Sequence, residues 1–99
     1  MKILGHGVEL GEIEAHVREA SGVDAVALGW PVNPGGADSI EVFVRAETAQ
    51  IDLIMKELKT ALPPYTVPRN IRVLPRLPLN ANGKFDRDAM RKLLELGTS

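Results

Sequence analysis

Glycine and proline are distributed along this 99-residue chain so that every helix or strand must be short. The 9 Gly and 7 Pro fall mainly between segments of regular hydrophobic spacing, where turns are expected. The sequence has no internal repeat and no low-complexity segment. With 44% hydrophobic residues, a chain of this length can form one compact core, so we expect a single domain over residues 1–99.

Three segments predict short amphipathic helices. In residues 11–20 apolar side chains recur at helical spacing, and Glu12 and Glu14 lie near the start, where the helix dipole favours acidic groups. Residues 50–62 repeat this spacing, with charged residues on the opposite face. Asp86 can cap a third helix. The apolar stripe of this third helix comprises Met90, Leu93 and Leu94.

Three further segments predict strands. Residues 23–30 and 39–45 are rich in β-branched and aromatic residues and predict an antiparallel pair, which the intervening sequence PVNPGGAD should end on both sides. Residues 70–74 predict a third strand. The order of elements predicts an α+β fold: a small three-stranded sheet flanked by helices, preceded by a glycine-rich, hairpin-like loop at the N-terminus.

Charge and composition exclude several classes of function. Lys and Arg number 12 against 13 Asp and Glu, so the net charge of -1 predicts no nucleic-acid partner. The absence of cysteine excludes disulfides, thiol nucleophiles and Cys-based metal sites, and we expect no metal site on this chain. The N-terminus lacks the apolar segment of a signal peptide, and no apolar run approaches the ~20 residues that cross a bilayer. We therefore expect a cytoplasmic protein with no membrane partner.

The first segment that folding alone does not explain is the sequence KILGHGVELGEIE near the N-terminus. Its glycines, including Gly5 and Gly7, allow unusual backbone angles and a close approach of the main chain to a ligand or another domain. The other interpretation is a hairpin that leads into a helix. His6, between these two glycines, should be exposed.

The second such segment is LPLNANGKFDR, which places Lys84 directly after Asn82 and Gly83. Pro75 and Pro78 restrict the preceding backbone and so narrow the range of positions available to the turn. Asn-Gly favours a type I′ turn, and Lys84 could simply follow such a turn in solvent. The alternative is a turn that delivers an ammonium group to a substrate.

Taken together, the two segments resemble the eighth and tenth core motifs of the adenylate-forming enzymes, which include acyl-CoA synthetases, luciferases and peptide-synthetase adenylation domains. The middle sequence LPPYTVPRNIRVLPRLP is also similar to this family. The resemblance covers nearly the whole chain and implies the small C-terminal subdomain of such an enzyme. The large N-terminal subdomain, which binds ATP and the acid, is absent from these residues.

The resemblance implies a role for Lys84 in the first of two reaction steps. In family members a carboxylic acid attacks ATP, with Mg as a further co-substrate, to form an acyl-adenylate and pyrophosphate. Lys84 matches the lysine that reaches the bridging and carboxylate oxygens at this step. A preplaced cation can stabilise the negative charge that is brought together there.

The same resemblance implies a second face that acts after a large rotation of the subdomain. The loop formed by Gly5, His6, Gly7, Val8 and Glu9 would line the channel for the phosphopantetheine thiol. Family members commonly have an arginine at the position of Gly7, so an anchoring contact is missing here. The family's hinge residue falls just before the position matched by Lys2, and we expect it to lie outside this chain.

The interpretation that we favour is the lid subdomain of an ATP-dependent ligase that loads an amino acid or related acid onto a carrier protein. Its partners would be the N-terminal subdomain and the carrier, and the isolated chain should be inactive. A lid of a CoA ligase and a non-catalytic interaction module of the same fold are the alternatives. A set of arginines could meet an acidic carrier or simply form a solvated face: Arg69, Arg72, Arg76, Arg87 and Arg91.

Overall fold

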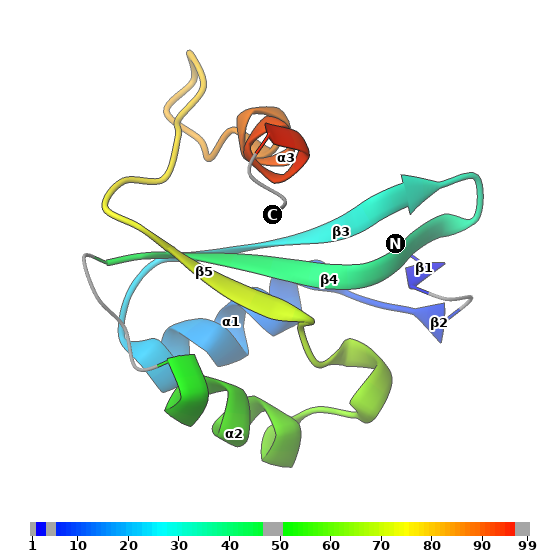
Figure 1. Ribbon diagram of the computed structural model, residues 1–99. Helices are drawn as coiled ribbons and strands as arrows, with labels where there is room; N and C mark the ends of the chain where they lie inside the picture. The colour runs from blue at the N-terminus through cyan, green and yellow to red at the C-terminus, as the bar shows by residue number, and fades with distance from the viewer. Residues whose placement is uncertain (1, 4–5, 47–50, 97–99) are drawn as a thin grey trace.

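The computed structural model describes residues 2–3, 6–46 and 51–96. They form a five-stranded mixed sheet with helices on both faces (Figure 1). The α+β class expected from the sequence is confirmed. The strands are β1 (Lys2–Ile3), β2 (His6–Gly7), β3 (Ala25–Asn33), β4 (Gly36–Arg45) and β5 (Asn70–Leu74).

Strand β4 lies inside the sheet and pairs with three other strands. Strand β3 runs antiparallel along one side of β4, whereas β1 and β5 pair in parallel with its other side, at Ala37 and at residues 41–45 respectively. Strand β2 pairs antiparallel with β1, which confirms the hairpin-like N-terminal loop. Strands β1 and β2 extend the expected sheet of three strands. The sequence does not predict them, because strands of two residues are too short to show an alternating hydrophobic pattern.

The β3–β4 hairpin is longer than the sequence pattern indicates. The pattern predicts a break after Trp30, but β3 continues to Asn33 and β4 begins at Gly36. Pro31 is accommodated because β3 is an edge strand and Pro31 forms no pair in the register with β4. Proline and glycine thus close a tight turn instead of ending both strands early.

All three predicted helices are present, and the two with predicted bounds begin and end within one residue of them. Helices α1 (Leu10–Ser21) and α2 (Ile51–Ala61) cover one face of the sheet, and α3 (Arg87–Leu96) covers the other (Figure 1). A short 3-10 helix, η1 (Pro64–Thr66), lies between α2 and β5. Within the described ranges, none of the helices combines the length and the apolar character of a membrane-spanning segment.

The alternation of side chains along β3 and β4 builds two cores, one on each face. Phe43 points toward α3, where it joins Met90 and Leu94. Leu93 is 41% exposed, so its expected place in the apolar stripe of α3 is wrong: it lies next to the buried face and not within it. The core beneath α1 and α2 includes Ile13, Val17, Ile40, Val42, Val44, Ile54 and Leu58.

Gly36 fixes how closely β1 can approach the β3–β4 turn. Its φ of 131° lies where residues with a side chain are strained, and an added Cβ would overlap the carbonyl oxygen of Lys2. At the neighbouring Gly35, an added Cβ would meet only the Asn33 side chain, at an ordinary 3.5 Å. The close approach of β1 therefore requires a glycine at position 36 but not at position 35, although both glycines belong to the same turn region.

We predict that Gly36→Ala lowers the free energy of unfolding by about 1–3 kcal/mol, because it adds backbone strain and displaces β1. Chemical denaturation of this variant and of Gly35→Ala measures the difference. Equal stability of the two variants would contradict the close contact between Gly36 and β1.

Candidate functional site: the Lys84 hairpin

Lys84 lies at the end of a tight hairpin that follows β5. Leu79 and Phe85 form an antiparallel bridge at its base, and the Asn80 N–H donates to the carbonyl oxygen of Lys84 at 2.8 Å. The Gly83 N–H donates to the Asn80 carbonyl oxygen at 3.0 Å, so the central residues of the turn are 81 and 82. The expectation that Asn82 and Gly83 form the centre of a type I′ turn is wrong.

The Asn80 side chain organises this turn from inside. Its Oδ1 accepts the backbone N–H groups of Asn82, at 2.9 Å, and of Lys84, at 3.1 Å. Gly83 adopts a φ of 77°, the left-handed conformation that closes a three-residue hairpin loop. Asn82 and Gly83 lie in this turn, but the side chain that stabilises it belongs to Asn80.

Two contacts brace the base of the hairpin against the domain. Phe85 packs on the core beneath α3, which also contains the buried Leu77. Asp86 donates its backbone N–H to the carbonyl oxygen of Pro78 at 2.8 Å, and its Oδ1 accepts the Ala89 N–H at 3.0 Å. The predicted helix cap at Asp86 is confirmed.

The Lys84 side chain projects from this braced turn into solvent. The residue is exposed, and among the residues described the Lys84 ammonium group is in no ion pair. The hairpin, drawn in yellow to orange in Figure 1, extends away from the sheet beside α3. A restrained backbone that carries an unengaged ammonium group can present positive charge to an anion outside the domain.

The glycine-rich loop forms the second candidate site. His6 is exposed, as predicted, and its ring stacks on Tyr65 of η1, with ring centroids 4.4 Å apart and planes 20° apart. Gly7 and Glu9 are exposed, whereas the Val8 side chain is buried in the core, so that only its backbone can face a channel. Gly5 lies outside the described residues.

The two candidate sites do not come together within this domain. The β1–β2 hairpin and the Lys84 hairpin lie at opposite ends of the molecule in Figure 1, separated by the sheet. This separation fits two sites that are used one after the other.

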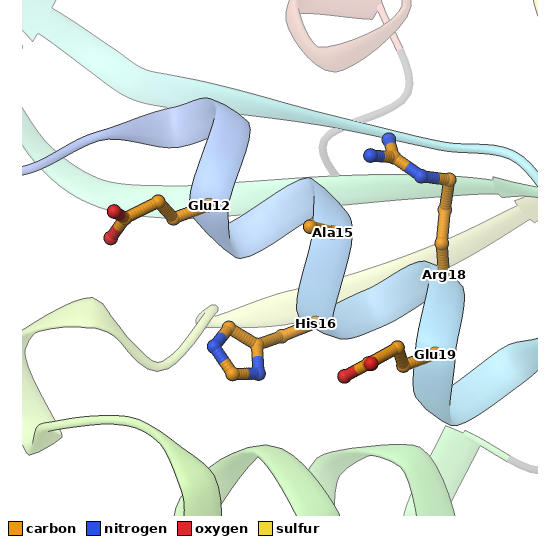
Figure 2. Close-up of a pocket in the computed structure, with 5 residues that line it drawn as sticks. All are labelled: Glu12, Ala15, His16, Arg18 and Glu19. Carbon is orange, nitrogen blue, oxygen red and sulfur yellow. The ribbon is translucent and has the colours of Figure 1, made fainter.

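A surface hollow of about 650 Å³ lies along α1, away from the Lys84 hairpin. The His16 side chain points from α1 toward α2, and Glu12 and Glu19 also line the hollow (Figure 2). The hollow is broad, and its lining residues carry both acidic and basic charge. None of these lining residues belongs to the β1–β2 hairpin or to the Lys84 hairpin. We assign no site to it.

No metal site is evident in the parts of the chain that the structure describes, because no three His, Asp or Glu side chains there are grouped so that they could hold an ion.

Three of the five arginines suggested for an acidic partner are engaged within the domain. Arg72 lies 3.9 Å from Glu41, Arg87 3.0 Å from Glu14, and Arg91 2.7 Å from Asp88. The described structure therefore offers a smaller free basic surface than the sequence suggests.

Glu14 differs from its expected role at the start of α1. It is buried, and its carboxylate accepts hydrogen bonds from the Ala27 N–H and the Arg87 guanidinium. Sequence reasoning also passed over Asn80, although an Asn at the first position of a turn that ends in Gly is typical of a type I turn. No sequence pattern indicates the Glu14–Arg87 pair, because its partners lie 73 residues apart.

Comparisons with known proteins find similarity across almost the whole chain. Surfactin synthase subunit 2 of Bacillus subtilis is 38% identical over 90 residues, which make up 91% of this chain and 2% of that protein. No protein-family model matches the chain.

Two solved structures share both fold and sequence. The four-domain nonribosomal peptide synthetase AB3403, bound to AMP and glycine, matches with a TM-score of 0.76 and 33% identity over 89% of this chain and 7% of that one. The Vibrio cholerae adenylation domain AlmE, in complex with glycyl-adenosine-5′-phosphate, matches with a TM-score of 0.79 and 28% identity over 100% of this chain and 18% of that one. The family resemblance seen in the sequence is confirmed, and the chain spans a small part of each relative.

We predict that Asn80→Ala loosens the hairpin, because two backbone N–H groups lose their acceptor, and that it costs about 1 kcal/mol of stability. Hydrogen exchange at the Lys84 amide should accelerate while the amides of β4 keep their protection. Asn82→Ala, which removes an exposed side chain in the same turn, serves as the control. Similar exchange in both variants would contradict the special role of the Asn80 side chain.

Proposed function

We propose that this segment, which belongs to the adenylate-forming enzymes as one of their C-terminal subdomains, is the movable lid of an ATP-dependent ligase. The ligase would adenylate an amino acid or a related carboxylic acid and transfer it to the pantetheine thiol of a carrier protein. The observation that carries this proposal is the Lys84 hairpin, in which a tightly bonded turn presents an exposed ammonium group that forms no ion pair with the described residues.

In the first step, Lys84 would act by electrostatic stabilisation. The acid carboxylate attacks the α-phosphorus of ATP, a new oxygen–phosphorus bond forms, and pyrophosphate leaves. The attack brings two negatively charged groups together, and an ammonium group placed beside their oxygens lowers the energy of that arrangement. A compact point charge on a flexible stem can reach both groups.

The brace at the base of the hairpin supports this role. Because Phe85 is packed in the core and Asp86 caps α3, the backbone on either side of the turn is held by the domain. Little conformational freedom remains to be lost when the lid closes. Positioning of this kind can lower a reaction barrier substantially, provided that the charge is aimed correctly.

In the second step, the glycine-rich loop would face the thiol. This loop lies at the end of the domain opposite to the Lys84 hairpin, so a rigid rotation could withdraw one site and present the other. The stack of His6 on Tyr65 holds the β2 end of the loop against η1. Gly7, which is exposed, leaves space beside the main chain for a narrow pantetheine arm.

ATP and Mg would be held mainly by the N-terminal subdomain, which lies outside these 99 residues. The chain would therefore contribute a single cation and a channel wall, and its primary partner would be that subdomain. AB3403, which is 33% identical, is a nonribosomal peptide synthetase bound to AMP and glycine, and this relationship supports an amino acid substrate.

We predict that Lys84→Ala lowers the rate of adenylate formation about a hundredfold, because one electrostatic contact to the reacting groups is lost. The measurement is amino-acid-dependent exchange of pyrophosphate into ATP, with this chain added to a matching N-terminal adenylation subdomain. The chain alone should give no exchange.

Lys92→Ala is the matched control, since Lys92 is also exposed and lies on α3 shortly after the hairpin. Equal exchange with the parent and with Lys84→Ala would reject a catalytic lid. Binding of the N-terminal subdomain without any effect of Lys84 would instead indicate a non-catalytic interaction module.

We predict that Gly5→Leu slows transfer to the thiol and leaves adenylate formation unchanged, because the added side chain would obstruct the pantetheine channel. Single-turnover transfer from preformed adenylate is measured with a carrier protein that bears a free phosphopantetheine thiol and, separately, with CoA. Gly11→Ala, on the exposed face of α1, is the control, as its Cβ meets no atom within 4 Å. Loss of both steps together would indicate misfolding and not a channel.

A further inference from the structure

A buried carboxylate joins the two helices that follow the candidate sites. The Glu14 side chain is 10% exposed, and its Oε2 accepts two hydrogen bonds. One comes from the Ala27 backbone N–H at 2.8 Å, and the other comes from Nη2 of Arg87 at 3.0 Å. The carboxylate therefore contacts α1, β3 and α3 at a single point.

This contact lies at the open edge of the sheet. Strand β3 is an edge strand, and the Ala27 N–H would otherwise face outward without a strand partner. Helices α1 and α3 lie on opposite faces, so Arg87 must reach around the β3 edge to meet Glu14. Among the ion pairs of the described residues, this one alone connects two helices.

Each residue of the pair ends one of the two sequence segments that carry the candidate sites. Glu14 is the last residue of the glycine-rich segment KILGHGVELGEIE, and Arg87 is the last residue of LPLNANGKFDR. Arg87 follows Asp86, whose N–H closes the base of the Lys84 hairpin and whose carboxylate caps α3. The hairpin therefore has two lateral anchors: the packing of Phe85 and the bond from Arg87 to Glu14.

We propose that Arg87 and Glu14 are positioning residues that hold the Lys84 hairpin in a fixed orientation relative to α1, and through α1 relative to the thiol-side loop. This inference rests on the proposed lid function. Both sites would then turn as one rigid unit, so that withdrawal of Lys84 and presentation of the loop are one motion. Neither residue touches substrate in this scheme.

The physical basis is the cost of leaving a buried carboxylate with fewer partners. When Arg87 is removed, Glu14 keeps the Ala27 N–H but loses its countercharge, which is strongly unfavourable for a buried group. The strain would be relieved locally, by movement of the start of α3 and of the hairpin attached to it. Because the Arg87 side chain is 45% exposed, solvent compensates part of this loss, and the domain should remain folded.

Native-state hydrogen exchange on this 99-residue chain tests the positioning role without any activity assay. In Arg87→Ala, the amides of Asn80 and Asp86, which bond across the hairpin, should exchange at least about tenfold faster. The amides of β4 should keep the rates of the parent. Arg87→Lys, which retains the charge but lacks the forked geometry, should give a smaller acceleration.

Arg45→Ala is the matched control, because Arg45 forms an ion pair with Asp24 at 3.1 Å in which both side chains are about half exposed. It should leave the exchange of the hairpin unchanged. Exchange in Arg87→Ala that equals the parent, or that rises uniformly over the whole domain, would overturn the inference. The uniform result would mean that the pair serves global stability only.

A kinetic measurement separates failure of this inference from failure of the proposed function. With the N-terminal subdomain present, Arg87→Ala should lower kcat of pyrophosphate exchange about tenfold, with an unchanged KM for ATP, since a small displacement of a catalytic group is enough to slow the reaction. A large effect of Lys84→Ala with none of Arg87→Ala would overturn the positioning role alone. Rapid hairpin exchange in Arg87→Ala together with an inert Lys84→Ala would retain the positioning role and reject the catalytic lid.

Discussion

Strand β4 is the element on which the rest of this domain depends. It pairs with β3 on one side and with β1 and β5 on the other, so every other strand except β2 is attached to it directly. Its alternating side chains supply both cores, with Val42 and Val44 beneath α1 and α2, and Phe43 beneath α3. The glycine-rich hairpin and the Lys84 hairpin both extend from strands that β4 holds in register.

The two candidate sites lie at different ends of one packed sheet. A braced turn at one end presents the Lys84 ammonium group, and a stacked loop at the other leaves open backbone at Gly7. The sheet between them is packed on both faces, so the rotation proposed for the lid would carry both sites together. The edge contact between Glu14 and Arg87 adds a direct link that the sheet hydrogen bonds do not provide.

Much of this arrangement could be predicted from the residues. The helical spacing of residues 50–62 and the β-branched run of residues 70–74 each led to the correct element, because a long regular pattern leaves few alternatives. The Asp86 cap was also predictable, as capping acts between neighbours in the sequence. The course of β3 past Pro31 was not, since only its position at the sheet edge makes a proline acceptable there.

By itself, the sequence determined the fold class, the place of each main element and the two segments that carry the candidate sites. These depend on local periodicity, turn residues and short motifs. Only the tertiary structure decided that Val8 is buried and that Glu14 meets Arg87 at the β3 edge. Such contacts depend on the distance between residues far apart in the chain, and the packing of α1 and α3 on opposite faces of the sheet sets that distance.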